Sequence, residues 1–244
     1  MPDARERLIV ALDVPNAPEA RRIVAAIGDS AQIYKVGKQL FTAEGPQVIR
    51  DLVASGRDVF LDLKYHDIPN TVAGAVRQAA QLGVRMLTVH ASGGLKMLRA
   101  AVEAAGDSRL GTRNSGLVVL AVTVLTSLND EDLREIGFSV RVVDQALRLA
   151  ALARTAGCGG VVTSAREVRE IRRELGPGFV IVTPGIRPAG TAQQDQERAA
   201  TPTEAITAGA SHIVVGRPIT AAPDPAAAAR RILDEITAAR AVLA

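Results

Sequence analysis

The stretch LVVLAVTVL, residues 117–125, indicates the architecture of this chain most clearly. A strand with one face in water alternates apolar and polar residues, whereas this run is apolar at nearly every position. Strands of that kind are typical of a parallel sheet that helices cover on both faces. The run Ile213–Val215 has the same character. We therefore expect the chain to contain a buried parallel sheet.

Short apolar runs of this type recur along the whole chain, and stretches with helical spacing separate them. The predicted strands are Leu8–Val14, Ile33–Gly37, Val59–Lys64, Met86–His90, Leu117–Leu125, Gly160–Thr163, Phe179–Thr183 and Ile213–Gly216. The predicted helices include Ala17–Ile27, Pro46–Ser55, Thr71–Leu82, Val142–Thr155, Ala165–Leu175, Pro202–Ala208 and Pro225–Leu243.

Eight β–α alternations with no break in composition predict an α/β fold, a closed (β/α)₈ TIM barrel that forms a single domain over residues 1–244. A doubly wound open sheet is the alternative, but no GxGxxG sequence follows the first predicted strand. In a (β/α)₈ barrel the active site lies at the carboxyl ends of the strands. Polar residues at those ends are therefore the first candidates for function.

The composition argues against several classes of protein. Hydrophobic residues make up 48% of the chain, enough for a large core, so we do not expect general disorder. Aromatic residues make up only 2%, and the net charge of +3 is scattered along the chain. Nucleic acid is therefore an unsuitable partner, because it needs stacking surfaces or a concentrated basic patch. A small phosphorylated ligand fits the mild basic excess better.

The compartment is predicted from the cysteine content and the apolar runs. Cys158 is the only cysteine, so the chain cannot form an internal disulfide, which fits a reducing cytosol. In the context AGCGGVV we expect it to be a small buried residue. The apolar run Leu8–Leu12 stops at Asp13 and is too short for an export signal. We expect a cytoplasmic protein that does not contact membranes.

Charged residues stand at the ends of the first three predicted strands: Asp13 in ALDVP, Lys35 in YKVGK, and Asp62 and Lys64 in FLDLKYHD. Charges at such positions are costly unless they are paired. We therefore expect these side chains to converge. A structural ion-pair network that braces the end of the barrel is the alternative interpretation.

Asp62 and Lys64 are two residues apart, so on a strand they point to the same side, while Leu61 and Leu63 point to the other. A lysine held among carboxylates stays protonated, because nearby negative charge favours its charged form. It can then donate a proton to a carbanion-like centre, which is general acid catalysis. Asp67 follows in a loop before the next helix, where a lone carboxylate is more often a surface turn residue.

The other end of the chain carries features of a phosphate site. Gly216 and Arg217 follow the last predicted strand, where barrels often bind phosphate with backbone N–H groups. Arg217 adds a planar, bidentate donor, although an arginine packed on the barrel rim is the alternative. The long loop before that strand carries two further candidates, Arg187 and Gln196.

The chain shows no metal-binding pattern. Its three histidines, His66, His90 and His212, lack the spacings of known metal motifs. His212 opens a buried strand, and we expect it to be structural.

Residues 62–72, DLKYHDIPNTV, closely resemble the DxKxxDIPNTV signature of the orotidine 5′-phosphate decarboxylase family. The resemblance extends over essentially the whole chain, through the motifs LDVP, KVGKQLF, VHASGG, VTVLTS, PGIRP followed by Gln196, and VVGRPIT. Gln39 stands where the family frequently has an acid, and Tyr65 where phenylalanine is common. Neither position belongs to the predicted chemistry.

The resemblance implies a carboxy-lyase that converts orotidine 5′-phosphate to uridine 5′-phosphate, the last step of de novo pyrimidine nucleotide biosynthesis, with no metal or other cofactor. It implies that Lys64 is the proton donor, that Asp62 faces the substrate carboxylate, and that Lys35 pairs with Asp62. It also implies a homodimer in which Asp67, the fourth implied catalytic residue, and Ile68 reach the partner's site.

The resemblance implies further contacts with the substrate. Asp13 would bind the ribose, and the base would contact Thr126 and Ser127, while Pro184 would line the pocket. The phosphate would be bound by Arg187, Gln196, Gly216 and Arg217. Thr71 would join Asp67 and Ile68 at the partner's site.

Three alternative functions are weighed against this one. A magnesium-dependent 3-keto-gulonate 6-phosphate decarboxylase has a similar DxKxxD pattern, but that family carries a glutamate ligand where this chain has Lys35. A charged lysine cannot bind magnesium, which also argues against a metal-dependent pentose-phosphate epimerase. A non-catalytic sensor of a phosphorylated ligand is the third candidate, and it would predict gaps in the set of charges.

Overall fold

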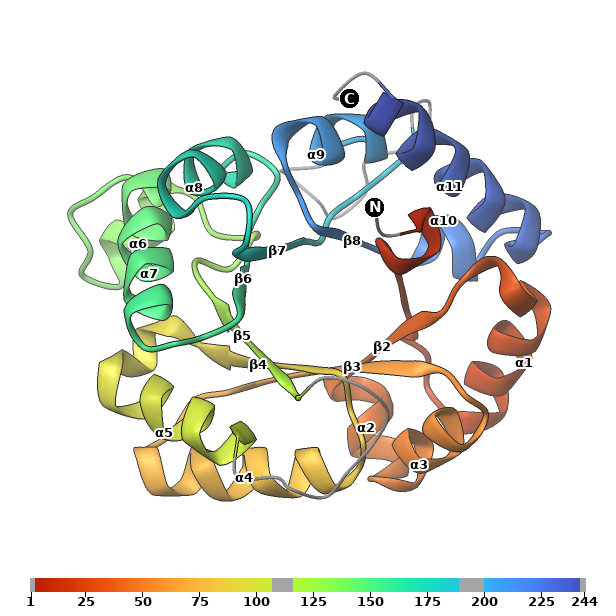
Figure 1. Cartoon of the computed structure of the whole chain (residues 1–244), viewed down its shortest axis with the longest axis horizontal. Helices are drawn as coiled ribbons and strands as arrows, with labels where there is room; N and C mark the ends of the chain where they lie inside the picture. The colour runs from red at the N-terminus through yellow and green to blue at the C-terminus, as the bar shows by residue number, and fades with distance from the viewer. Residues whose placement is uncertain (1–2, 107–115, 189–199, 242–244) are drawn as a thin grey trace.

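In a computed structural model, which describes residues 3–106, 116–188 and 200–241, the strands form a closed parallel barrel in the order β1 to β8 (Figure 1). The strands are β1 (Leu8–Ala11), β2 (Ile33–Gly37), β3 (Asp58–Tyr65), β4 (Met86–His90), β5 (Val118–Val122), β6 (Gly160–Val162), β7 (Val180–Thr183) and β8 (His212–Val215). Because β1 pairs with β8 as well as with β2, the barrel prediction is confirmed and the open-sheet alternative is wrong.

Helices surround the barrel on its outside (Figure 1). They are α1 (Ala17–Ile27), α2 (Lys38–Glu44), α3 (Gln47–Ala54), α4 (Pro69–Gln81), α5 (Gly94–Gly106), α6 (Asp130–Glu135), α7 (Val142–Thr155), α8 (Val168–Leu175), α9 (Pro202–Ala208), α10 (Arg217–Thr220) and α11 (Pro225–Ala241). Three short 3₁₀ turns are η1 (Ala4–Glu6), η2 (Gly28–Ser30) and η3 (Ala91–Gly93). None of these helices is long and apolar enough to cross a membrane, in the part of the chain that the structure describes.

The predicted and observed elements differ mainly at their ends. β1 stops at Ala11 and β5 at Val122, in each case three residues before the predicted end, which was Val14 for β1 and Leu125 for β5. Apolar character does not mark the end of a strand here, because Val124 is buried among the outer core residues without belonging to the ladder. Helices α2, α5, α6 and α10 are additions to the predicted set.

Alternation along the strands produces two separate cores. Ile9, Ile33 and Phe60 belong to a cluster inside the barrel, whereas Leu8 and Val10 pack outward against the helices. Because successive strand side chains point to opposite faces, Lys35 lies on the same face as Ile33. The sequence period that fills the barrel interior therefore also directs charged side chains into its carboxyl end.

Cys158 and His212 both occupy positions that fit a structural role. Cys158 is buried, which raises the pKa of its thiol to about 12 and keeps it protonated. His212 begins β8, and its Nδ1 donates to the carbonyl of Glu6 at 2.8 Å. Burial lowers the pKa of His212 to about 4, so the ring is neutral. His212 is the first residue of β8 and Cys158 lies two residues before β6, so both are away from the strand ends that carry the charges.

Candidate active site

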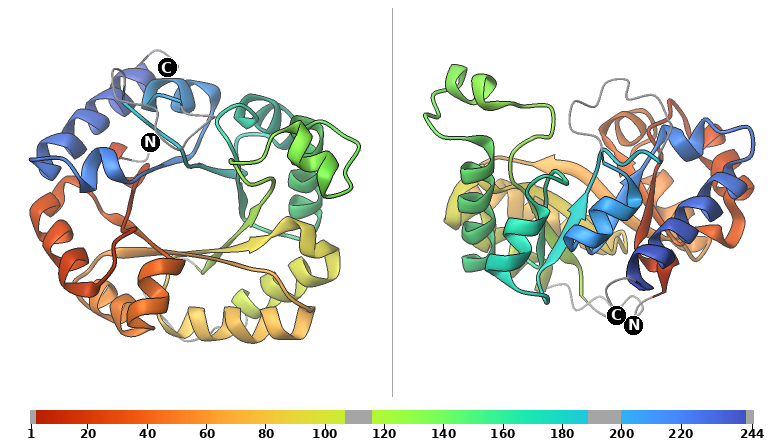
Figure 2. Two further views of the ribbon diagram at one scale, coloured as in Figure 1. Left: turned by 180° about the vertical axis from the view of Figure 1, so that it is seen from behind. Right: turned by 90° about the horizontal axis from the view of Figure 1, so that it is seen from above.

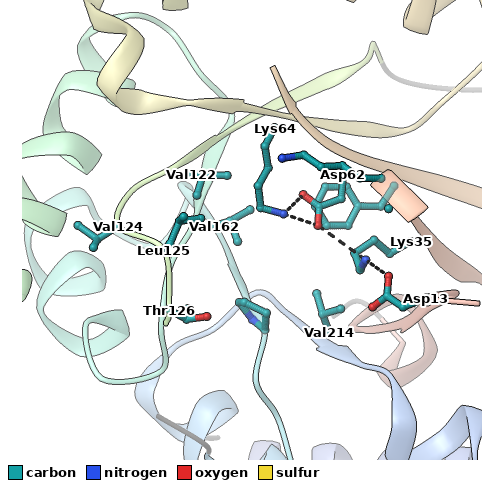
Figure 3. A pocket seen from close by; sticks show the side chains of 14 residues that line it. Asp13, Lys35, Asp62, Lys64, Val122, Val124, Leu125, Thr126, Val162 and Val214 are labelled. Carbon is teal, nitrogen blue, oxygen red and sulfur yellow. Dashed lines mark hydrogen bonds and ion pairs between the residues drawn. The ribbon is translucent and has the colours of Figure 1, made fainter. Parts of the chain in front are cut away.

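A cavity of about 350 Å³ opens at the carboxyl end of the barrel. Helix α6 and the segment after it project beyond the barrel on that side (Figure 2). Charged residues from the first three strand ends line one side of the cavity, and mainly apolar residues line the other (Figure 3). The lining residues are Asp13, Lys35, Gly37, Lys38, Phe60, Asp62, Lys64, Val122, Val124, Leu125, Thr126, Val162, Pro184 and Val214.

Four of these side chains, Asp13, Lys35, Asp62 and Lys64, form a continuous line of alternating charge, which we call the charge array (Figure 3). Lys35 Nζ lies 2.7 Å from Asp13 Oδ1 and 3.8 Å from Asp62 Oδ2. Lys64 Nζ lies 2.8 Å from each oxygen of Asp62. The predicted convergence of these charges is therefore what the structure shows, and their formal charges cancel.

Asp62 is the centre of the charge array, with its side chain only 12% exposed. Burial alone would raise the pKa of this carboxyl group, but the charges of Lys64 and Lys35 and the hydrogen bonds to Asp62 outweigh burial and lower it. Asp62 is therefore ionised at neutral pH. Its negative charge lies directly against the ammonium of Lys64.

Lys64 has a strained backbone, with φ of 55°. This left-handed region is uncommon for residues other than glycine, and such strain is concentrated at functional sites. The strain coincides with a shift in strand pairing, since Leu61 pairs with Leu87 whereas Tyr65 pairs with Val89. The irregularity means that simple alternation does not describe the strand at Lys64.

The space beside the charge array is narrow at Gly37. A Cβ atom at this position would lie 3.0 Å from both Asp13 Oδ1 and Lys35 Nζ. Such contacts are tighter than side chains normally make, so a larger residue would press on the ion pair. The glycine in the motif KVGKQLF thus leaves room for the first two members of the charge array.

The opposite wall of the cavity is formed mainly by Val122, Leu125, Val162 and Val214, with Pro184. Apolar walls exclude water and strengthen electrostatic interactions across the cavity. A ligand between the two walls would contact ammonium and carboxylate groups on one side and hydrocarbon on the other. Of the two predicted base-contacting residues, Thr126 lines the cavity, whereas Ser127 is exposed and is not among the lining residues.

The predicted phosphate-binding residues lie at the ends of the last two strands. Gly216 follows β8 directly and precedes Arg217, the first residue of α10. Arg217 is exposed, and Arg187 is half-buried four residues after β7, with its Nη1 3.1 Å from the Ile186 carbonyl. Gln196 lies outside the described residues.

Asp67, Ile68 and Thr71 stand apart from the cavity of their own chain. All three are exposed, and Ile68 exposes 67% of its surface. Asp67 accepts a hydrogen bond from the backbone N–H of Ile68 at 2.6 Å, just before α4 begins at Pro69. None of them lines the cavity. Asp67 and Ile68 lie in the loop that follows β3, and Thr71 lies in the first turn of α4.

The structure adds residues that the sequence prediction did not include. Thr88 on β4 is fully buried and contacts both Asp62 and Lys64. The sequence feature that could have indicated Thr88 is the hydroxyl-bearing residue within the mostly apolar run MLTVH. Lys38 also lines the cavity. His90 lies beside His66, with ring centroids 5.4 Å apart, and burial together with neighbouring positive charges lowers its pKa to about 4.

A search for metal ligands gives no candidate. In residues 3–106, 116–188 and 200–241, no group of three or more His, Cys, Asp or Glu side chains is arranged to hold a metal ion.

Comparison with known proteins connects this geometry to a family. Residues 6–232 match the model of the orotidine 5′-phosphate decarboxylase / HUMPS family. The chain belongs to this family. A relative from Moorella thermoacetica named orotidine 5′-phosphate decarboxylase is 53% identical, over 96% of this chain and 93% of its own. A protein of the same name from Geobacter sulfurreducens is 50% identical, over 96% of this chain and 98% of its own.

Solved structures agree with this family assignment. The crystal structure of orotidine 5′-phosphate decarboxylase from Lactobacillus acidophilus aligns with a TM-score of 0.85 and 41% identity, over 95% of this chain and 99% of its own. The enzyme of that name from Pyrococcus horikoshii aligns with a TM-score of 0.75 and 27% identity, over 94% and 99%. The similarity to orotidine 5′-phosphate decarboxylases therefore extends over the whole barrel.

Proposed function

We propose that this protein converts orotidine 5′-phosphate to uridine 5′-phosphate and carbon dioxide, the last step of de novo pyrimidine nucleotide biosynthesis, without a metal or other cofactor. The observation that carries the proposal is the contact of Lys64 with both oxygens of the largely buried Asp62, in the lining of the cavity. Relatives at 50% identity or more carry the name of this enzyme, which supports the same substrate here.

The reaction requires stabilisation of negative charge at a carbon atom. When the bond between C6 of the pyrimidine and the carboxylate breaks, carbon dioxide leaves and the electron pair remains at C6. A fixed ammonium group next to that carbon lowers the energy of the developing charge, because it needs no reorganisation when the charge appears. Lys64 then transfers a proton to C6, and solvent reprotonates the lysine.

The remaining members of the charge array orient Lys64 and its neighbours. Asp62 holds the ammonium of Lys64 through two contacts, while Lys35 lies between Asp62 and Asp13. With the array in place, the substrate carboxylate would lie near Asp62 and the ribose hydroxyls near Asp13. This arrangement gives each half of the nucleoside a charged partner on the same wall of the cavity.

The phosphate of the substrate would bind beyond the ends of β7 and β8, at Gly216, Arg217 and Arg187, with Gln196. Binding energy from this remote group can be used to close the site and to orient the reacting carbon. Thr126 and Pro184, which also line the cavity, would contact the base and form part of the pocket wall.

A magnesium-dependent 3-keto-gulonate 6-phosphate decarboxylase is the principal alternative. Lys35 counts against it, because its ammonium lies 2.7 Å from Asp13 and 3.8 Å from Asp62, where a metal ligand would be required. A cation held there repels magnesium and supplies no lone pair. A non-catalytic sensor is disfavoured by the complete charge array, since binding alone does not require a lysine beside a buried carboxylate.

The test is to incubate the purified protein separately with orotidine 5′-phosphate and with 3-keto-gulonate 6-phosphate plus magnesium, and to identify the products by chromatography. We expect uridine 5′-phosphate from the first incubation and no decarboxylation in the second. Turnover of the keto sugar alone would establish the alternative. Binding of uridine 5′-phosphate with no turnover of either substrate would establish the sensor.

The functional unit would be a homodimer in which Asp67 and Ile68 complete the partner's site, with Thr71 beside them. Their exposure and their absence from the cavity of their own chain support this arrangement. We expect Asp67→Ala and Lys64→Ala homodimers to be nearly inactive separately and to regain activity when subunits are exchanged, because one site of the mixed dimer is then intact. The measurement is turnover after mixing, and no recovery despite proven exchange would contradict the shared site.

A further inference from the structure

We infer that Thr88 is the positioning residue that fixes Asp62 and Lys64 in their working geometry. This inference rests on the proposed function, and it assigns a role to a side chain that does not line the cavity. Thr88 lies in the middle of β4, with no solvent exposure. It belongs to the same face of the strand as Met86, which lies inside the barrel, so its hydroxyl points toward the interior.

The directions of the hydrogen bonds at Thr88 follow from the atoms involved. The backbone N–H of Lys64 can only donate, so the hydroxyl of Thr88 accepts this bond, at 2.9 Å. The single hydroxyl hydrogen is then available for Asp62 Oδ1, 3.0 Å away. An ionised carboxylate only accepts hydrogen bonds, which agrees with the lowered pKa of Asp62. One hydroxyl therefore connects the backbone of the lysine to the side chain of the aspartate.

The bond to the backbone matters because of the conformation of Lys64. Its φ of 55° is unfavourable and needs support from its surroundings. The β3–β4 pairing shifts between Leu61 and Tyr65, so the ladder is irregular where Lys64 lies. A side-chain hydroxyl on β4 accepts the N–H of Lys64 at this irregularity. Thr88 thus holds the backbone from which the catalytic ammonium projects.

The bond to the carboxylate fixes the other half of the pair. Asp62 Oδ1 receives Lys64 Nζ at 2.8 Å and the hydroxyl of Thr88 at 3.0 Å. The second bond restricts rotation of the carboxyl group, so that both oxygens stay directed at the ammonium of Lys64. Neither bond involves the predicted phosphate-binding residues. Loss of the hydroxyl should therefore affect the chemical step more than ligand binding.

Thr183 supplies a matched control. Like Thr88, it is a fully buried threonine on a barrel strand, although it is the last residue of β7 whereas Thr88 is central in β4. Its Oγ1 has no hydrogen-bond partner among the described residues. Replacing either threonine by valine keeps the side-chain shape and removes one buried hydroxyl. The difference between the two variants therefore isolates the hydrogen bonds of Thr88.

The experiment compares Thr88→Val, Thr88→Ser and Thr183→Val with the wild type. We expect Thr88→Val to lower kcat for orotidine 5′-phosphate about 10- to 100-fold, as for one or two lost hydrogen bonds that include a charged acceptor. The dissociation constant of uridine 5′-phosphate should change less than about threefold. Thr88→Ser, which retains the hydroxyl, and Thr183→Val should both keep kcat within about threefold of the wild type.

The dependence of kcat on pH gives a readout that a loss of stability alone would not move. Because Thr88 donates to the ionised carboxylate, its removal should raise the pKa of Asp62. The acid limb of the kcat profile should therefore move to higher pH in Thr88→Val and stay in place in Thr183→Val. A folded Thr88→Val variant with wild-type kcat and an unchanged profile would overturn the inference.

Two further measurements keep the result decisive. If Thr88→Val does not fold, Thr88→Cys, whose thiol is a weak hydrogen-bonding group of similar size, should show the loss of kcat relative to Thr88→Ser. A crystal structure of the variant should show a changed Lys64 backbone or a broken Asp62–Lys64 contact. The crystal structure does not depend on turnover. If the wild type proved inactive, the proposed function would be refuted, but the structure of the variant would still decide whether Thr88 positions Asp62 and Lys64.

Discussion

Replacement of Lys64 by alanine is expected to lower kcat for orotidine 5′-phosphate about 10⁴- to 10⁷-fold. The variant loses both the proton donor, which contributes about 10²- to 10⁴-fold, and the charge that stabilises the electron pair at C6, which contributes about 10²- to 10³-fold. The measurement is steady-state turnover by the loss of orotate absorbance. Binding of uridine 5′-phosphate should be retained, because its phosphate would bind at Gly216 and Arg217, after β8, and not at Lys64 on β3.

The control for this variant is Lys96→Ala. Lys96 is exposed on α5 and does not line the cavity, so the same substitution there should leave kcat unchanged. A folded Lys64→Ala variant that still decarboxylates its substrate within about tenfold of the wild-type rate would remove the proposed proton donor, since general acid catalysis alone is worth more than that.

Arg217→Ala should lower kcat/KM about 10²- to 10⁴-fold, the effect of losing two charge-assisted hydrogen bonds to the phosphate. Both kcat and KM should change, because binding energy from the phosphate is used to orient the reacting carbon as well as to hold the substrate. The measurement is the kcat/KM of the wild type and the variant for orotidine 5′-phosphate and, in parallel, for orotidine, which lacks the phosphate.

The comparison with orotidine makes the test specific. If Arg217 acts on the phosphate, its removal should leave kcat/KM for orotidine unchanged, whereas a general disturbance of the barrel would lower both values. Arg230→Ala serves as the control, since Arg230 is exposed on α11. An equal loss for both substrates, or no loss for either, would contradict the phosphate role of Arg217.

The architecture could be predicted from the sequence because its signal is repeated. Eight apolar strands alternate with amphipathic helices, and each repeat supports the same fold. The bounds of β2 and β4 agree with the predicted ones, because polar or helix-forming residues follow those runs directly. The predicted strands were too long at β1 and β5, because apolar residues such as Val124 are buried without pairing in the sheet.

Part of the candidate site also followed from the sequence. The positions of Asp13, Lys35, Asp62 and Lys64 at strand ends predict that the side chains meet, because neighbouring parallel strands end at one edge of the barrel. Thr88 did not follow in the same way. Its role depends on the irregular pairing of β3 with β4 and on the positive φ of Lys64, which periodicity does not encode.

Contacts made by loops are the hardest to predict from spacing. Thr126 and Ser127 are adjacent, yet only Thr126 lines the cavity. Asp67 was expected on a protruding loop, and it lies in an exposed one, but strand geometry alone could not say which site it serves. Family resemblance supplied that expectation, and the homodimer that it implies stays a proposal.

The measurement that tests the account most directly is the absorbance assay of the metal-stripped protein with orotidine 5′-phosphate in the presence of EDTA. If the charge array alone supplies the electrostatic stabilisation, the substrate absorbance should disappear at the same rate with and without the chelator. A folded protein that is inactive in EDTA and regains activity on addition of magnesium would contradict the account, because an ion would then supply what is assigned here to Lys64 and Asp62.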